Sequence, residues 1–388
     1  METQNQIFTK RFISLFFTNM AVFFVFYGLV TTLPLYAIGA LGRTDEDAGL
    51  LVTVFLISAI LVRPFSGKLL DMYGKKRMLV IGVLLYFIST ILYLFVKPFM
   101  LLLALRFFQG IWFSILTTAA GSLAADIVPA NRKGAGLGYF TMSTNLAVVI
   151  GPFVGLLIIQ HFDYNTLFIV LSIIVFLGSC IALTIKTDDL PKSENVDRSF
   201  KFTFDDLFER KALPIAFLAC LVAFAYASVL SFISIYAEQQ NLLAVASYFY
   251  AVFAAAMLIT RPFTGKIYDH KGPKYVILPA FILFAIGLFI LSMTSGAFFF
   301  LVAAIFIGIG YGTLTTSFQS LAVQSTVHQR SGYATATYFT LFDLGIAVGS
   351  YILGVVAVQL DYASVYMIAG IVLLVVFFLY ILTFVKRK

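Results

Sequence analysis

The sequence VRPFSGKLLDMYGKKR, from Val62 to Arg77, ends one long apolar stretch and begins the next. A closely similar sequence, TRPFTGKIYDHKGPKY, starts at Thr260. The offset between residues 63 and 261 is 198 positions, about half of the 388-residue chain. A repeat of this length indicates two related halves and not a solenoid of short units. The shared positions are Arg63, Pro64, Gly67, Asp71 and Gly74 in the first copy, and Arg261, Pro262, Gly265, Asp269 and Gly272 in the second.

The composition indicates a membrane protein that crosses the bilayer several times. Hydrophobic residues make up 61% of the chain and charged residues only 11%, whereas a soluble domain has about 25% charged residues. The two cysteines, Cys180 and Cys220, lie in apolar stretches and predict packing roles in place of a disulfide framework. The three histidines lack the spacing of metal ligands, so we expect no metal site and no cofactor.

Twelve apolar stretches are long enough to span a bilayer as helices, which takes about 20 residues each. They predict an all-α integral membrane fold with 12 transmembrane helices in two six-helix, pseudo-symmetric halves. We expect an N-terminal half over residues 1–186, a cytoplasmic linker over 187–212 and a C-terminal half over 213–388. In the linker, Phe202 to Arg210 favour a short amphipathic surface helix. The predicted spans are 12–36, 48–68, 77–96, 99–123, 135–160, 165–186, 213–236, 245–266, 275–293, 297–322, 333–359 and 363–385.

Basic residues gather in alternate loops, as in the segments 75–77, 132–133 and 386–388. This asymmetry predicts that these loops and both termini are cytoplasmic, in a multi-pass protein of the cell (plasma) membrane. The net charge of +8 is then a topology signal, and no nucleic-acid partner is expected. We expect a monomer whose partners are the lipid bilayer, protons and a small-molecule substrate.

Four motifs together resemble those of the major facilitator superfamily, and the resemblance covers essentially the whole chain. Residues 67–76 are similar to its signature loop, G-x-L-x-D-R-x-G-R/K-R/K, with Met72 where a basic residue is usual. Residues 125–132 resemble the matching segment after the fourth helix, and 106–110 resemble the fourth-helix pattern R-x-x-Q-G. Residues 151–155 resemble the fifth-helix pattern G-P-x-x-G of antiporters. The resemblance implies the major facilitator fold and points to its 12-helix drug/proton antiporter branch.

The signature loop predicts a gate. Asp71 and Asp269 follow a helix end at the cytoplasmic surface, where each carboxylate can face the N-terminus of a helix from the other half, near Gly332 and Gly134 respectively. We expect these contacts to form in one access state and to break in the other; the alternative is a simple turn cap. The residues predicted to take part in gating are Arg63, Gly67, Asp71, Gly74, Lys75, Asp126, Arg132, Arg261, Gly265 and Asp269.

Pro152 predicts a kink in the fifth helix, because proline removes one backbone hydrogen bond. Gly151 and Gly155 allow tight packing beside it. Kinks of this kind are ordinary in membrane helices, so an antiporter function depends mostly on the resemblance. The equivalent stretch of the second half, residues 349–354, lacks the proline.

Charged side chains inside the apolar stretches mark functional sites, because each costs about 2.5–3.5 kcal/mol at the bilayer centre. Arg106 in the fourth helix cannot lose its proton, so it would hold a substrate anion or lower the pKa of a carboxylate; a structural arginine is the alternative. Asp343, near mid-depth of the eleventh helix, is predicted to carry a proton or to form an ion-pair latch with Arg63. Glu238, at the outer end of the seventh helix, is a second proton-coupling candidate.

The resemblance also implies that helices one, four, seven and ten line the substrate cavity. Helical spacing selects one face of each. Aromatic walls with sparse polar groups suit amphipathic organic molecules, although aromatic stripes also serve plain packing. The predicted cavity residues are Asn19, Phe23, Phe26, Tyr27, Gln109, Phe113, Tyr226, Tyr311, Thr315, Phe318 and Gln319.

These features predict a secondary active transporter that exports small amphipathic organic compounds, as in multidrug efflux, by proton-coupled alternating access. No G-x-x-x-x-G-K-S/T motif is present, so the energy should come from a gradient. We expect no enzyme, because no nucleophile–base pair stands out. The alternatives are a lipid flippase and a dedicated exporter or importer of one metabolite, such as a metallophore, a sugar or an organic anion.

Overall fold

The computed structural model describes residues 6–43, 45–186, 203–294 and 296–385, which form helices joined by short loops and contain no β-strand. Ten helices of this part are long and apolar enough to cross a membrane, by length and composition. The predicted all-α membrane fold is confirmed. The long helices are α1 (Lys10–Gly39), α2 (Asp45–Tyr73), α3 (Lys75–Leu92), α4 (Phe99–Ile127), α5 (Lys133–His161), α6 (Tyr164–Leu183), α8 (Leu213–Gln239), α9 (Leu243–Lys271), α10 (Lys274–Ser292), α11 (Ala297–Gln324), α12 (Ser331–Gln359) and α13 (Tyr362–Tyr380).

The contacts within the chain define two compact units. Unit 1 comprises Met1–Pro129, Phe140–Glu209 and Thr326–Thr337. Unit 2 comprises Ala130–Tyr139, Arg210–Ser325 and Tyr338–Lys388. The first turns of α5 therefore belong to unit 2, and the first turns of α12 belong to unit 1. The predicted halves, 1–186 and 213–388, follow the order of the chain and stay a prediction.

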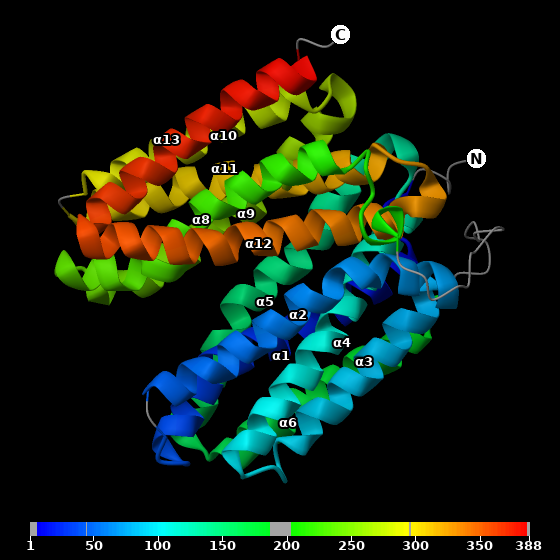
Figure 1. Ribbon diagram of the computed structural model, residues 1–388, viewed down its shortest axis with the longest axis vertical. Coiled ribbons are helices and arrows are strands. Elements are labelled where there is room, and N and C mark those ends of the chain that lie inside the picture. The colour runs from blue at the N-terminus through cyan, green and yellow to red at the C-terminus, as the bar shows by residue number, and fades with distance from the viewer. Residues whose placement is uncertain (1–5, 44, 187–202, 295, 386–388) are drawn as a thin grey trace. The chain divides into compact units, whose positions relative to one another are not determined.

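Within unit 1, α4 packs against α2 and α3, and α6 packs against α1 and α3 (Figure 1). Glycines allow this close approach. A Cβ atom on Gly82 would lie 2.8 Å from the Cβ of Leu116, and one on Gly178 would lie 2.8 Å from the Cβ of Ala21. Small residues stabilise membrane helix pairs in this way, because lipid supplies no hydrophobic force between helices.

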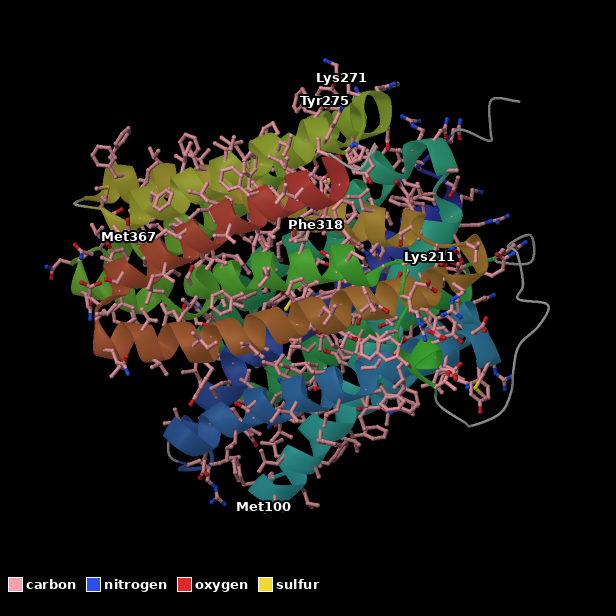
Figure 2. All side chains as sticks on the ribbon, turned by 45° about the horizontal axis from the view of Figure 1, so that its top comes forward. Met100, Lys211, Lys271, Tyr275, Phe318 and Met367 are labelled. Carbon is pink, nitrogen blue, oxygen red and sulfur yellow. The ribbon has the colours of Figure 1, made fainter. Side chains whose placement is uncertain are left out.

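Unit 2 repeats this pattern, with α11 against α9 and α10, and α13 against α8 and α10. A Cβ atom on Gly287 would lie 2.6 Å from the Ile307 side chain. Figure 2 shows mostly carbon along the flanks of these helices, with Lys211 and Lys271 at helix ends. This distribution suits helices whose sides contact lipid.

Residues 187–202 of the predicted linker lie outside the described part of the chain. The remainder contains α7, which runs only from Phe204 to Leu207, so the surface helix predicted up to Arg210 is a single turn. Asp206 on this turn lies 3.1 Å from the ammonium of the buried Lys68 on α2. Burial alone would raise the pKa of the Asp206 carboxyl, but hydrogen bonds from Thr203 and Lys68 outweigh it and hold the pKa below its ordinary value. The linker turn is thereby fastened to α2 within unit 1.

Candidate functional site

The signature loop between α2 and α3 docks against the first turns of α12 within unit 1. Gly67 is essential to this approach, because a Cβ atom there would lie 2.9 Å from the Cα of Tyr333. The half-buried Asp71 accepts a long hydrogen bond, 3.4 Å, from the Tyr333 hydroxyl. Gly74 precedes α3 with a φ of +89°, which residues with a Cβ rarely adopt. Asp71 therefore meets α12 through a side chain, whereas contact with the helix N-terminus was expected.

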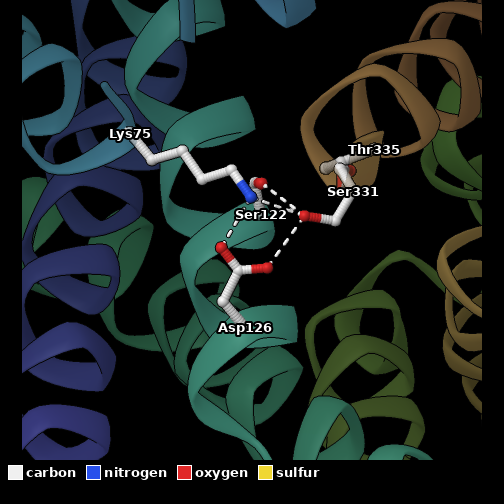
Figure 3. Close-up of polar contacts among 5 residues, drawn as sticks. All are labelled: Lys75, Ser122, Asp126, Ser331 and Thr335. Carbon is white, nitrogen blue, oxygen red and sulfur yellow. Dashed lines mark hydrogen bonds and ion pairs between the residues drawn. The ribbon is translucent and has the colours of Figure 1, made fainter. Parts of the chain in front are cut away.

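The strongest polar contacts of this docking point centre on Ser331, the first residue of α12 (Figure 3). The Lys75 ammonium lies 2.6 Å from Asp126 Oδ2 and donates a 2.6 Å hydrogen bond to Ser331 Oγ. Ser331 in turn donates to Asp126 Oδ1 at 2.8 Å, and Ser122 Oγ lies 3.3 Å from the same hydroxyl. Lys75 and Asp126 were singled out from the sequence. Ser122 and Ser331 were not, because nothing local in the sequence distinguishes two serines among many.

The end of the linker, residues 205–209, also binds the start of α12. Arg330, just before α12, forms an ion pair with the buried Glu209 and donates to the Asp205 carbonyl at 2.7 Å. The backbone N–H of Glu209 donates to Thr337 Oγ1 at 2.8 Å. This pairing was not predicted, because it joins residues more than 100 positions apart in the chain.

Unit 2 contains the corresponding contact, between the end of α9 and the first turns of α5. Asp269 accepts a hydrogen bond from the Gly134 amide at 2.8 Å and another from the Ala135 amide at 3.0 Å. These amides are free at a helix N-terminus, where they favour an anion. A Cβ atom on Gly265 would lie 2.6 Å from the Cα of Ala135. Arg132, in the 3₁₀ turn Ala130–Arg132, adds an attractive charge toward Asp269. This is the geometry that the sequence predicted for Asp269.

The two repeat-related arginines of α2 and α9 are both buried. Arg63 donates a long hydrogen bond, 3.4 Å, to Thr117 on α4 within unit 1. Arg261 donates to the Gly312 carbonyl on α11 at 2.7 Å within unit 2. Because Asp343 belongs to unit 2 and Arg63 to unit 1, a latch between them stays a prediction.

Arg106 is fully buried in a polar network of unit 1. Its Nε donates to the Leu51 carbonyl and its Nη1 to Gln109 Oε1, both at 2.9 Å. The guanidinium also lies 4.4 Å from the centre of the Phe55 ring, a cation–π contact. Gln109 accepts a second bond, 2.8 Å, from the Tyr93 hydroxyl. The sequence identified Arg106 and Gln109 but not their partners on α2 and at the C-terminal end of α3.

Aromatic side chains of α1 and α4 form one cluster in unit 1. Phe113 lies 5.3 Å from Phe23 and 4.7 Å from Phe26, measured between ring centres. Tyr27 stacks on Phe23 at 6.1 Å. Asn19, on the same helix, donates to Ser143 at 2.8 Å and to Thr144 at 3.1 Å on α5. The structure thus brings together the aromatic residues that the sequence placed on these two helices.

A second aromatic cluster lies in unit 2. Tyr226 of α8 stacks on Tyr311 of α11 with ring centres 3.7 Å apart, and Phe253 of α9 lies 6.0 Å from each. Thr315 is half-buried one turn along α11. By contrast, Phe318 is fully buried and lies 5.9 Å from Phe281 and 6.1 Å from Tyr380, on the side of α11 that faces α10 and α13 (Figure 2). Gln319 is buried as well.

Asp343 and Glu238 are the two acidic residues predicted to couple protons to transport. Asp343 is half-buried on α12. Glu238 belongs to α8, and its side chain lies outside the described part of the structure. Proton coupling by either residue stays a prediction.

Glycines of α5 pack on α1 within unit 1. A Cβ atom on Gly151 would lie 2.8 Å from the Phe24 carbonyl oxygen, and one on Gly155 would lie 3.0 Å from the Thr32 methyl. Pro152 lies inside the continuous helix. In unit 2, Gly349 of α12 packs on α8 in the same way, 2.6 Å from the Phe224 carbonyl oxygen. Glycine packing is therefore common to both repeats, whereas the proline is present in one.

The family model of the Major Facilitator Superfamily matches residues 15–350 and 246–388. The chain belongs to this superfamily. An uncharacterized MFS-type transporter of Methanocaldococcus jannaschii, MJ1560, is 28% identical over 352 residues, which are 88% of this chain and 91% of the relative. The quinolone resistance protein NorA of Staphylococcus aureus is 33% identical over 147 residues, 38% of this chain and 37% of NorA. The relative that covers most of this chain, MJ1560, is thus described as a transporter of the same superfamily.

Two solved structures of the superfamily share the fold. The human organic anion transporter MFSD10 (TETRAN) superposes with a TM-score of 0.78 at 14% identity, over 95% of this chain and 98% of that one. The transporter FucP, in its outward conformation, gives a TM-score of 0.76 at 16% identity with the same coverage. The chain is thus a multi-pass membrane transporter with the major facilitator fold.

Proposed function

We propose that this transporter exports small amphipathic organic compounds in exchange for protons, by alternating access in the cell membrane with both termini in the cytoplasm. The observation that carries the proposal is the pair of aromatic clusters, around Phe113 in unit 1 and around Tyr311 in unit 2. Flat aromatic faces with few hydrogen-bonding groups accept varied apolar compounds without demanding one shape. The partial likeness to NorA, a quinolone resistance protein, supports the same substrate class.

In this proposal Asp343 is the proton carrier, with Glu238 as the second candidate. Asp343 is a half-buried carboxylate within an apolar span, where ionisable side chains are costly and usually serve a function. Arg106 then sets the local electrostatic potential from its buried position, since it cannot itself release a proton.

The gate consists of the docking contacts at the starts of α5 and α12. The Asp269 contact and the Ser331 cluster hold these first turns within their units. We propose that they form in one access state and separate in the other, which would couple loading of the site to the side that is open.

The test is a pH-gradient assay in sealed proteoliposomes. A panel of lipophilic cations, neutral drugs and organic anions is added, and proton movement is recorded for the wild type and for Asp343→Asn. Asp361→Asn is the matched control, because Asp361 is an exposed cap of α13. We expect several unrelated compounds to trigger proton movement in the wild type and the control, and Asp343→Asn to bind substrate without moving protons. Silence across the panel would remove the support for proton antiport.

A dedicated carrier of one organic anion is the second candidate. It is favoured by Arg106, whose buried Nη2 has no hydrogen-bond partner in the described part of the chain. An anionic substrate that reached this group would complete its hydrogen bonds. Proton movement with organic anions alone, lost in Arg106→Gln, would decide for this candidate.

A further inference from the structure

Arg261 is a buried cation whose hydrogen bonds are incomplete. Its side chain is 3% exposed, and only Nη1 is satisfied, by the Gly312 carbonyl. Nε and Nη2 have no hydrogen-bond partner, and no ion pair joins Arg261 to an acidic side chain among the described residues. An unpaired buried charge is strongly destabilising, and buried donors in proteins almost always have a partner, which is sometimes a water or an ion. Something is therefore expected at the open side of this guanidinium.

A small cavity of unit 2 lies at this side. The first turns of α5 contribute Gly134 and Gly138, and the rest of the lining comes from α9 and α11: Arg261, Thr264, Gly265, Tyr268, Thr313, Thr316 and Ser317. The space exists partly because position 138 has no side chain. A Cβ atom there would come within 3.9 Å of Arg261 Cδ and 3.8 Å of the Thr316 methyl.

The hydroxyl groups around the cavity differ in whether they already donate a hydrogen bond. Thr264 donates to backbone carbonyls of its own helix, and so does Thr316. Thr313 and Ser317, by contrast, make no hydrogen bond within the described part of the chain. The cavity thus presents up to four donors, two from Arg261 and two hydroxyls, and its lining contains no carboxylate.

We propose that this cavity binds one small monovalent anion of halide size. A set of donors around a fixed positive charge, without a carboxylate, is the chemistry of an anion site. A water molecule would complete hydrogen bonds but would leave the charge uncompensated. The cavity has room for about one water-sized particle, so a halide fits only after a small displacement of the lining side chains, and sulfate, phosphate and carboxylate substrates are larger still.

The bound anion would stabilise the docking of α5 within unit 2. It would contact α5 beside Gly138, next to the point where Asp269 accepts the amides of Gly134 and Ala135. The Asp269 carboxylate is close to the cavity, because a Cβ atom on the lining residue Gly134 would lie 2.8 Å from its Oδ1; the two amides and Arg132 act against its negative charge. The proposal goes beyond the proposed function, because it concerns a resident ion and holds for any substrate or coupling ion.

Thermal unfolding of the purified full-length protein tests the proposal without any transport measurement. The protein is prepared in sodium gluconate, and chloride replaces gluconate at constant ionic strength. We expect a saturable rise in unfolding temperature, about 2 °C or more when chloride exceeds its half-saturating concentration tenfold. Sulfate should give no such rise.

Three variants assign the effect to this cavity. Arg261→Gln should abolish the chloride-dependent rise. Gly138→Ala should fold normally, because its Cβ makes only ordinary contacts, and should raise the half-saturating concentration at least tenfold by filling the space. Arg63→Gln is the matched control in unit 1 and should keep the rise. An equal rise in Gly138→Ala and wild type would overturn the assignment.

Bromide provides a direct readout. A crystal grown in bromide should show an anomalous peak beside the guanidinium of Arg261, within hydrogen-bonding reach of Ser317, and should lack it in Gly138→Ala. A cavity that contains only water in that crystal, together with no saturable chloride effect, would overturn the proposal and leave the transport function untouched.

Discussion

The starts of α5 and α12 occupy equivalent positions of the repeat, yet they are held by different chemistry. At both, a glycine of the preceding motif meets the backbone of the docked helix: Gly265 against Ala135, and Gly67 against Tyr333. In unit 2 the docked helix is bound through its backbone amides, by Asp269. In unit 1 it is bound through a side chain, Ser331, and the equivalent carboxylate, Asp71, makes a single long hydrogen bond among the described residues.

The difference follows from the residues that do not repeat. At the offset of 198 positions, Lys75 and Asp126 correspond to Pro273 and Gln324. Ser331 corresponds to Lys133. Unit 2 therefore lacks the means to build the cluster seen in unit 1 and relies on one carboxylate at a helix N-terminus. The repeat has kept the backbone approach and replaced the polar contacts, so the two docking points should respond differently to mutation.

The largest effect is expected at Asp126. Asp126→Asn leaves the Lys75 ammonium beside a neutral group and deprives Ser331 of its charged acceptor, within a largely buried site. Removing one partner of a buried pair costs about 3 kcal/mol or more, so unfolding in detergent should occur at clearly lower denaturant concentration. Gln324→Ala, at the equivalent position of unit 2, is the control and should cost far less. Similar losses in the two variants would contradict the contrast between the units.

The next effect is expected at Asp269. Asp269→Asn retains one oxygen that accepts a single amide, so one of the two charge-assisted bonds to α5 is lost and the other is weakened. We expect a loss of about 2 kcal/mol in the free energy of unfolding. Hydrogen exchange at Gly134 and Ala135 should speed up, while the amides of α12 should keep their protection. Faster exchange at α12 alone would place the contact elsewhere.

Glycine substitutions test the shared backbone approach. Gly265→Ala puts a Cβ atom 2.6 Å from a backbone atom that cannot rotate away, at a cost of about 1–2 kcal/mol. Gly332→Ala is the matched control, because its nearest neighbour would be 3.6 Å away. The unfolding temperatures of Gly265→Ala and Gly332→Ala are measured relative to wild type, and we expect the larger decrease for Gly265→Ala. Equal behaviour of both variants would argue against close docking as the reason for the glycine at 265.

The smallest effect is expected at Asp71. Its bond from the Tyr333 hydroxyl is 3.4 Å long, so Asp71→Asn should change the free energy of unfolding by less than about 0.5 kcal/mol. The same assay that detects Asp269→Asn would measure this difference. A loss as large as that of Asp269→Asn would show that the two carboxylates are equivalent after all.

The sequence was sufficient for the fold and for part of the site. Low charge and twelve long apolar stretches demand membrane helices, and the glycines of the repeated motif predict close helix contacts. The position of Asp269 at the start of α5 was also predictable, since a carboxylate after a helix end has few better partners than free amides.

The remaining contacts depend on residues far apart in the chain, and no local pattern announces them. Ser331 is an ordinary first residue of a helix until Lys75 and Asp126 are placed beside it. Repeat symmetry predicts that Asp71 binds backbone amides as Asp269 does, but Asp71 accepts a long hydrogen bond from the Tyr333 hydroxyl. Repeat symmetry also fails to predict the partners of Arg261: Arg63 donates to Thr117, whereas Arg261 donates to the Gly312 carbonyl although a threonine is also present at the equivalent position, 315.

The membership of the first turns of α5 and α12 has a consequence for any attempt to divide the chain. Residues 130–139 precede α6 in the chain but belong to unit 2, and residues 326–337 precede α13 but belong to unit 1. A fragment that ended after α6 would therefore lack one segment of its own unit and would carry one segment of the other. We expect the two fragments to be more stable when they are produced together than when each is produced alone.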